Sequence, residues 1–240
     1  MSGSARQMPL ALRWPSRQRF AWFRTAPGNA AALDAMRRLA QAPAAPWVLL
    51  TGPAGSGKTH LLLAACQHVQ AAGRRARYAS AARLAGQPDA LRALAGGDLL
   101  ALDDLDALAG QRADEHALFD LYNQLRADGV ALALAARLAP AALPLALPDL
   151  RSRLGACVQA PLQPLDEDAR RALVREWAAE RGLELEPAVL DWLFARAARD
   201  LASLHTLFER MDHAALARQQ RVTIPLLRTL LSAPVDARQI

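Results

Sequence analysis

A glycine-rich segment at residues 52–59 constrains the fold of this chain more than any other feature. Its residues, Gly-Pro-Ala-Gly-Ser-Gly-Lys-Thr, match the pattern G-x-x-x-x-G-K-[ST] in full. The apolar run 47–51 before it predicts a buried strand, and residues 58–72 after it predict a helix. A strand that turns through glycines into a helix presents backbone N–H groups and the positive helix end to a polyphosphate. The segment therefore predicts a phosphate-binding loop on an α/β fold.

Lysine usage supports that prediction. The chain has 29 Lys and Arg residues together, and Lys58 is the only lysine among them. A compact ammonium group suits the β- and γ-phosphates of a nucleotide and differs in shape and hydration from the planar guanidinium of Arg. We therefore expect ATP or ADP to bind the loop, with the Thr59 hydroxyl on Mg²⁺. The predicted cofactor-binding residues are Gly52, Pro53, Ala54, Gly55, Ser56, Gly57, Lys58, Thr59 and His60.

A second set of candidate residues follows the apolar run 99–102. Asp103 and Asp104 stand where that predicted strand ends. In a P-loop protein, an acid at the end of a neighbouring strand helps to hold the metal ion. We assign Asp103 to Mg²⁺ together with Thr59, and Asp104 to catalysis as the residue that orients water. The alternative is a strand that ends in solvated acids with no chemical role.

Predicted strands and helices alternate as far as Pro161, which indicates a parallel five-stranded sheet flanked by helices. Only helical patterns remain after Pro161, and they predict a small all-helical C-terminal lid domain. The expected division is an extended basic arm at 1–28, an α/β nucleotide-binding domain at 29–163 and a helical lid at 164–240. The predicted strands are 47–51, 77–79, 99–103, 130–136 and 157–160, and the predicted helices are 30–40, 58–72, 115–127, 167–181, 187–198, 200–218 and 224–231.

The net charge of +6 is concentrated in the N-terminal segment. Residues 1–46 hold seven arginines and one acid, Asp34, and this difference equals the charge of the whole chain. A nearly neutral body argues against a large DNA-binding face, and a short basic arm favours steering toward an acidic partner. No apolar run reaches the roughly 18 residues of a membrane span, so we expect no membrane association. Cys66 and Cys157 lie in apolar stretches and predict free thiols in a reducing, cytoplasmic compartment.

Several short motifs occur in a fixed order along the chain. They are residues 57–62, Asp103-Asp104-Leu105 followed by Leu108-Ala109-Gly110, residues 119–123, residues 148–154, and Thr223-Ile224-Pro225. With these motifs the chain resembles the DnaA-related AAA+ family over nearly its whole length. It is most similar to the branch of that family that inactivates the replication initiator DnaA. The resemblance implies a P-loop AAA+ module with a helical lid.

Two features point to this branch. The initiator has a DNA-reading domain, for which we expect no counterpart after Ile240. The hexapeptide Gln7-Met8-Pro9-Leu10-Ala11-Leu12 is similar to the peptide with which the inactivators bind the DNA polymerase sliding clamp, the beta subunit. Because a Gln with spaced apolar side chains can insert into a preformed pocket, Gln7, Met8, Leu10 and Leu12 are the predicted partner-binding residues. The alternative is a disordered tail that binds nothing.

Residues 148–154 are similar to the family motif that carries the arginine finger. This resemblance implies that Arg153 adds positive charge to the γ-phosphate of ATP bound to another subunit, an effect typically worth about 10³–10⁵ in rate. Arg151 lies two residues away and points elsewhere on a helix, so it ranks second. Without the resemblance, the alternative is a pair of solvated surface arginines.

The chain departs from the family pattern at both sensor positions. Ala135-Ala136, followed by Arg137, stand where the family has a polar residue after the fourth strand, and Ala202 stands where the lid presents its arginine. Arg199, about one helical turn earlier, is a candidate substitute. Loss of both sensors predicts weak autonomous hydrolysis, so that the nucleotide acts mainly as a structural ligand.

The expected function is negative regulation of the initiation of chromosomal replication. The nucleotide-bound protein would bind the clamp, contact DNA indirectly through it, and stimulate hydrolysis of the ATP bound to DnaA. One alternative is an autonomous AAA+ ATPase of the loader or motor type, which the complete nucleotide motifs favour. Another is a DNA-binding initiator-like factor. The sequence leaves open whether the chain self-associates as a homo-oligomer.

Overall fold

The computed structural model describes residues 18–26, 28–42, 44–180, 182–183, 185–196, 204, 207–208, 210–211 and 223–232. Two compact units divide the chain. The first contains Ala30–Thr51 and Gly57–Pro161, and the second contains Arg24–Asn29, Gly52–Ser56 and the residues from Leu162 onward. The predicted limits of the arm, the nucleotide-binding domain and the lid stay a prediction.

The first unit is built on a five-stranded parallel sheet in the order β2-β3-β4-β1-β5. β1 lies between β4 and β5, so that Leu50 stands opposite Ala135 on one side and Ala160 on the other. The predicted fold class, a parallel five-stranded sheet with a helical lid, is confirmed. The strands are β1 (Val48–Thr51), β2 (Ala76–Ser80), β3 (Leu99–Asp103), β4 (Ala131–Ala136) and β5 (Val158–Pro161).

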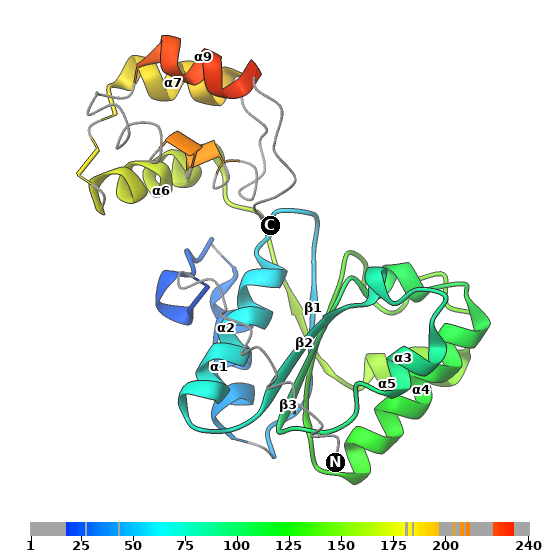
Figure 1. The fold of residues 1–240 in the computed structure, drawn as a ribbon. Coiled ribbons are helices and arrows are strands. Elements are labelled where there is room, and N and C mark those ends of the chain that lie inside the picture. The colour runs from blue at the N-terminus through cyan, green and yellow to red at the C-terminus, as the bar shows by residue number, and fades with distance from the viewer. Residues whose placement is uncertain are drawn as a thin grey trace, which may run out of the picture. The chain divides into compact units, whose positions relative to one another are not determined.

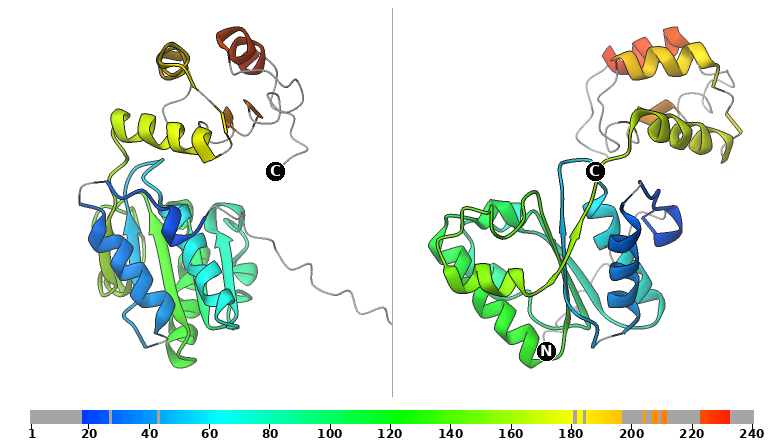
Figure 2. Two further views of the ribbon diagram at one scale, coloured as in Figure 1. Left: turned by 90° about the vertical axis from the view of Figure 1, so that its left-hand side faces the viewer. Right: turned by 180° about the vertical axis from the view of Figure 1, so that it is seen from behind.

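Helices cover both faces of this sheet. α1 and α2 lie on one face, and α3, α4 and α5 lie on the other (Figures 1 and 2). The cover follows from the sequence of the central strands, because every residue of β1, β3 and β4 is buried and such strands must be shielded on both faces. The helices are α1 (Ala30–Gln41), α2 (Lys58–Ala71), α3 (Pro88–Arg92), α4 (Arg112–Ala127) and α5 (Pro148–Gly155).

Three helices differ from the sequence prediction, and one of them, α5, lies outside every predicted helical range. α3 is five residues long, too short to show a helical apolar period, and the sequence analysis does not predict it. α4 begins at Arg112 instead of residue 115, because Asp114 and Glu115 are buried and accept hydrogen bonds from backbone N–H groups elsewhere in the unit. A pattern-based analysis takes such acids for exposed residues.

A short part of the N-terminal segment departs from the extended conformation that its prolines and arginines predict. Phe20–Trp22 form a 3-10 helix, η1. The Phe20 ring lies 5.9 Å from that of His68, and the Phe23 ring lies 5.5 Å from that of His60, both on α2. Aromatic contacts with α2 therefore stabilise a local helical turn at these residues, and the predicted arm as a whole stays a prediction.

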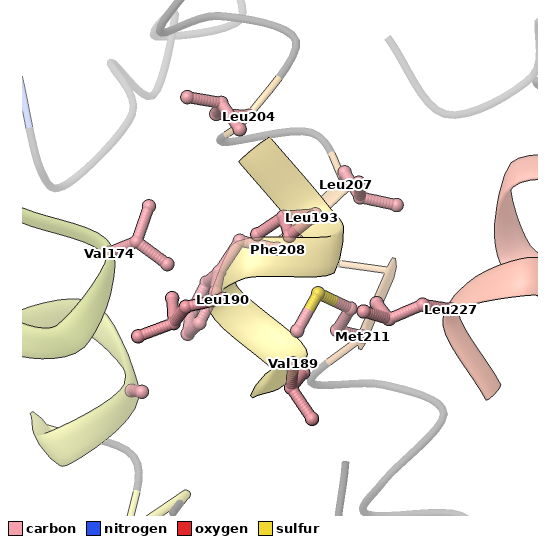
Figure 3. Close-up of a cluster of buried hydrophobic side chains, with 10 residues drawn as sticks. Val174, Val189, Leu190, Leu193, Leu204, Leu207, Phe208, Met211 and Leu227 are labelled. Atoms are coloured by element: carbon pink, nitrogen blue, oxygen red, sulfur yellow. The ribbon is translucent and has the colours of Figure 1, made fainter. Parts of the chain in front are cut away.

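The second unit contains a small helical core. Asp166 caps α6 (Glu167–Glu180), since its Oδ1 accepts a hydrogen bond from the Ala169 N–H at 2.7 Å. The predicted helix 200–218 lies largely outside the described residues. Figure 3 shows the apolar side chains that pack together in this unit. The helices are α6 (Glu167–Glu180), α7 (Pro187–Arg196) and α9 (Ile224–Ser232), and the buried cluster comprises Val174, Ala178, Val189, Leu190, Leu193, Leu204, Leu207, Phe208, Met211 and Leu227.

Among the described residues, the structure has no helix that combines the length and the apolar character needed to cross a bilayer.

Candidate functional site

The glycine-rich segment turns tightly between β1 and α2. A Cβ atom on Gly52 would come within 2.3 Å of the Leu162 carbonyl oxygen, so no other residue fits there without a shift of the backbone. Gly57 has a φ of 95° and directly precedes α2, and a Cβ atom on it would lie 2.7 Å from the Phe23 ring. These positions need glycine for close approach and for a left-handed backbone, as a loop that wraps a phosphate does.

Two side chains of this loop suit a bound anion. The Ser56 hydroxyl oxygen is buried and has no hydrogen-bond partner among the described residues. Burial lowers the pKa of Lys58, an effect that the charges of Asp103, Asp106 and Asp104 oppose. A polyphosphate would provide an acceptor for the hydroxyl and a negative charge for the ammonium group. The residues present therefore fit the nucleotide phosphates predicted from the sequence.

Thr59 and Asp103 meet at the start of α2 and the end of β3. The Thr59 hydroxyl donates a hydrogen bond to Asp103 Oδ2 at 2.5 Å. Tyr78 on β2 donates a second hydrogen bond to the same oxygen at 3.2 Å. The Asp103 side chain is buried, which raises the pKa of its carboxyl group, and the Thr59 hydrogen bond opposes that rise. A hydroxyl and a buried carboxylate in contact are the pair that a P-loop protein uses to hold Mg²⁺ and its water ligands.

Asp104 differs from Asp103 in backbone conformation and in exposure. Its φ is 57°, in the left-handed region that non-glycine residues seldom adopt, and its side chain is exposed. Ser80 at the end of β2 donates a hydrogen bond to Asp104 Oδ2 at 2.8 Å. Such backbone conformations occur at functional sites when neighbouring groups hold them in place. The two acids thus have separate environments, in keeping with the separate roles predicted for them.

His60 has a contact that the sequence does not indicate. Its Nε2 atom lies 3.0 Å from the Arg19 carbonyl oxygen, and its ring packs near Phe23. The side chain therefore ties α2 to the N-terminal segment. Contact between His60 and a nucleotide stays a prediction.

The first sensor position is apolar in the structure as well as in the sequence. Ala135 and Ala136 end β4, are fully buried and pair with Leu50 and Thr51. Arg137 follows, and its backbone N–H donates to Asp106 Oδ2 at 2.7 Å. Ala202 and Arg199, the two lid positions considered for the second sensor, lie outside the described residues. The clamp-peptide residues Gln7, Met8, Leu10 and Leu12 also lie outside them.

The two arginines of α5 have different surroundings. Arg151 Nη2 donates to the carbonyl oxygens of Leu145 at 2.8 Å and of Leu143 at 3.4 Å, so this guanidinium holds the turn that precedes the helix. Arg153 is exposed, and its guanidinium carbon lies 5.9 Å from the centre of the Tyr122 ring. Both arginines are exposed, but Arg151 binds backbone carbonyl groups, whereas Arg153 lies near an aromatic ring.

Arg153 lies near the amino ends of β1 and β5. Its carbonyl oxygen accepts a hydrogen bond from Tyr122 at 3.3 Å, and the Tyr122 ring packs edge-on against Trp47 at 4.6 Å. Trp47 directly precedes β1, and its carbonyl oxygen accepts the Val158 N–H at 2.8 Å. Lys58 and Thr59 follow the opposite end of β1, a strand of four residues and thus about 13 Å long.

Comparison with known proteins agrees with this geometry. The family model of the bacterial DnaA ATPase domain matches residues 15–160. The chain belongs to the bacterial DnaA ATPase-domain family. The model of the Hda lid domain matches residues 166–231, in the helical second unit. A DnaA-type ATPase domain followed by an Hda lid identifies a DnaA-related replication regulator.

Solved structures have the same fold as this DnaA-related chain. Domain III of the replication initiation protein DnaA from Thermotoga maritima is 23% identical with a TM-score of 0.75, over 91% of this chain and 97% of that one. AMPPCP-bound DnaA from Aquifex aeolicus is 22% identical with a TM-score of 0.68, over 86% of this chain and 70% of that one. The RuvB T158V variant from Thermotoga maritima is 21% identical with a TM-score of 0.63, over 89% and 71%.

Three residues of this DnaA-related chain that the sequence analysis does not single out have direct contacts around the site. Tyr78 donates a hydrogen bond to Asp103, and Ser80 donates one to Asp104. Glu115 accepts a hydrogen bond from the segment before α5. The position of Tyr78 and Ser80 on β2, the strand beside β3, is the signal that could have indicated them. No local signal marks Glu115, because two of its three partners, the N–H groups of Ala146 and Leu147, lie 31 and 32 residues away in the sequence.

Proposed function

We propose that this chain binds ATP or ADP with Mg²⁺ at the loop 52–59 and donates Arg153 to the ATP of a DnaA molecule docked against it. Hydrolysis of that ATP would leave an ADP-bound, inactive initiator and so limit re-initiation. The chain would act as an activator of a partner's ATPase, with the reacting ATP in a site composed of both proteins. Membership of the DnaA family and the Hda-type lid support this choice of partner.

The position of Arg153 carries the proposal. Arg153 is associated with the amino ends of β1 and β5 through Tyr122 and Trp47, whereas Lys58 and Thr59 follow the carboxyl end of β1. A guanidinium at one end of the sheet does not reach phosphates at the other end of the same sheet. An exposed arginine in this position is therefore available to a nucleotide on a second protein.

The chain's own nucleotide site has the residues for binding a nucleotide but fewer of the residues that promote its hydrolysis. Gly52 and Gly57 have the positive φ angles that a phosphate-wrapping loop needs. Lys58 supplies the positive charge, and Thr59 with Asp103 would hold the metal ion. When bound, Mg²⁺ would neutralise phosphate charge. Ala135 and Ala136 contribute no polar group at the end of β4 to position water. We therefore propose weak intrinsic hydrolysis, with the nucleotide stabilising the fold.

The clamp peptide completes the proposal. Gln7, Met8, Leu10 and Leu12 would bind the sliding clamp and so hold the chain where clamps remain on newly replicated DNA. Tethering converts the encounter with DnaA into one at high effective concentration without a new contact between the two proteins.

The test follows hydrolysis of ATP loaded on DnaA in the presence of the chain, the clamp and DNA. The wild-type chain should accelerate it, and Arg153→Ala should lose the acceleration by a factor of up to about 10³–10⁵ while still binding the clamp. Gln7→Ala should lose clamp binding but keep Arg153 active when the chain is supplied in excess. Full stimulation by Arg153→Ala would show that another group supplies the charge.

A second candidate, an autonomous ATPase, is favoured by one observation: Thr59 and Asp103, the residues predicted to hold Mg²⁺, are hydrogen-bonded to each other. Phosphate release by the purified chain alone separates the two candidates. Brisk turnover without DnaA or clamp, lost in Asp104→Asn, would favour the motor or loader class over the regulator.

A further inference from the structure

Glu115 is a fully buried carboxylate that binds the backbone of two separate segments. Its Oε1 accepts hydrogen bonds from the N–H groups of Gly110 at 2.7 Å and Ala146 at 3.0 Å. Its Oε2 accepts one from the Leu147 N–H at 2.7 Å. Gly110 follows η3 (Leu105–Leu108), and Leu147 is the N-cap residue of α5. One side chain in the first turn of α4 therefore joins two connections that are far apart in the sequence.

The hydrogen bonds of Glu115 explain how a carboxylate can be buried at this position. A buried charge is costly unless hydrogen bonds satisfy it, and charge-assisted bonds to backbone N–H groups are among the stronger ones. An amide or an apolar side chain cannot accept all the hydrogen bonds that Glu115 accepts here. Loss of the carboxylate would leave the N–H groups of Ala146 and Leu147 without their acceptor and free the start of α5.

The same connection is held from a second direction by a cation. Arg151 Nη2 donates to the carbonyl oxygens of Leu143 and Leu145. An anion thus binds the N–H groups of the connection and a guanidinium binds its carbonyl groups. Together they fix the point at which α5 begins, and the start of a helix determines where each later residue points. Arg153 lies within the first two turns of this helix.

The other partner of Glu115 leads back to the nucleotide site. Asp103 and Asp104 end β3, η3 follows them directly, and Gly110 comes just after η3. Glu115 therefore connects the segment after the predicted metal-site acids with the helix that carries the exposed arginine.

We propose that Glu115 is a positioning residue for Arg153, which it holds in register by fixing the start of α5. This inference rests on the proposed function of Arg153 as a finger toward a partner's ATP. Arg153 is the group that would touch that ATP, and Glu115 acts only through α5. Displacement of a reacting group by about 1 Å lowers rates by up to about a hundredfold, so the effect on stimulation should be large.

Asp114 provides a matched control. It is the neighbour of Glu115 on α4, is equally inaccessible at 1% exposure, and accepts a backbone N–H bond at 2.7 Å. Its partner is Gly86, which lies before α3 and not beside α5. Glu115→Gln and Asp114→Asn thus make the same chemical change in adjacent buried acids and release different loops.

The experiment measures hydrolysis of DnaA-bound ATP as a function of the concentration of the full chain, with clamp and DNA present. Glu115→Gln should lower the maximal rate about ten- to a hundredfold, whereas Asp114→Asn should stay within about twofold of the wild type. Saturating amounts of chain compensate for molecules that are unfolded, so a low maximal rate reports on folded ones. The double variant Glu115→Gln/Arg153→Ala should match Arg153→Ala, since both residues act through one guanidinium.

Amide hydrogen exchange gives a second measurement that does not depend on catalysis. The amides of Ala146 and Leu147 should exchange faster in Glu115→Gln than in the wild type and be unchanged in Asp114→Asn. A wild-type maximal rate in Glu115→Gln, or an equal loss in Asp114→Asn, overturns the inference. Stimulation that survives in Arg153→Ala is a different result, because it overturns the proposed finger itself.

Discussion

The Thr59 hydroxyl and the Asp103 carboxylate are joined by a hydrogen bond of 2.5 Å between the first turn of α2 and the last residue of β3. The bond connects the end of the phosphate loop with the acid that ends the neighbouring strand. The two oxygen atoms therefore suit a cation that would take the place of the hydrogen-bonded proton between them.

Removal of either partner should weaken binding of the metal-nucleotide complex more than binding of the nucleotide alone. Thr59→Ala and Asp103→Asn should each lower the affinity for Mg²⁺-ADP about tenfold or more, because a metal contact of this kind depends on both oxygens. Titration with a fluorescent ADP analogue, with Mg²⁺ and with EDTA, measures the difference. Equal affinities of the wild type and Thr59→Ala for Mg²⁺-ADP would exclude Thr59 as a metal-site residue.

Replacement of Gly52 should disrupt the loop far more than replacement of a glycine in open space. Gly52→Ala places a methyl group 2.3 Å from the Leu162 carbonyl oxygen and should abolish nucleotide binding. Gly129→Ala is the control: its φ is also positive, at 66°, but nothing lies within 4 Å of the added carbon. It should cost only about 1–2 kcal/mol of stability. Comparable nucleotide binding by both variants would contradict the close-packed loop.

Substitution of Arg151 should lower the stability of the fold more than substitution of Arg153 does. Arg151→Ala removes the donor for the Leu143 and Leu145 carbonyl groups and should lower the free energy of unfolding by about 1.5–3 kcal/mol. Arg153→Ala removes an exposed guanidinium near the Tyr122 ring and should cost at most about 1 kcal/mol. Urea unfolding measures both. A larger loss of stability in Arg153→Ala than in Arg151→Ala would reverse the assignment of structural and exposed roles.

Asp103 should make the stability of the nucleotide-free protein fall as pH rises. Burial raises the pKa of Asp103 in the folded state, whereas the carboxyl group of the unfolded chain ionises at about pH 4. Between these two pKa values the folded chain binds more protons than the unfolded chain. Stability therefore declines through this window. Asp103→Asn should show a smaller decline in urea unfolding between pH 4 and 7 without Mg²⁺. Equal slopes for the two proteins would contradict a raised pKa.

The sequence was sufficient for the parts of this protein that depend on local pattern. The glycine loop between an apolar run and a helix, the acids at the end of β3 and the change to helical patterns after Pro161 predicted the α/β sheet with its lid. Each of these signals lies within a few neighbouring residues, where backbone conformation and apolar periodicity determine the outcome.

Only the tertiary structure decided which polar groups meet. Tyr78 shares Asp103 with Thr59, Glu115 binds Gly110 and Leu147, and Phe23 packs near His60. These pairs come from separate elements, so the order of the strands and the packing of helices determine their contacts. Arg151 and Arg153 are chemically identical in the sequence. The turn before α5 and the ring of Tyr122 give them different surroundings, because side-chain contacts depend on the fold around a residue as well as on its type.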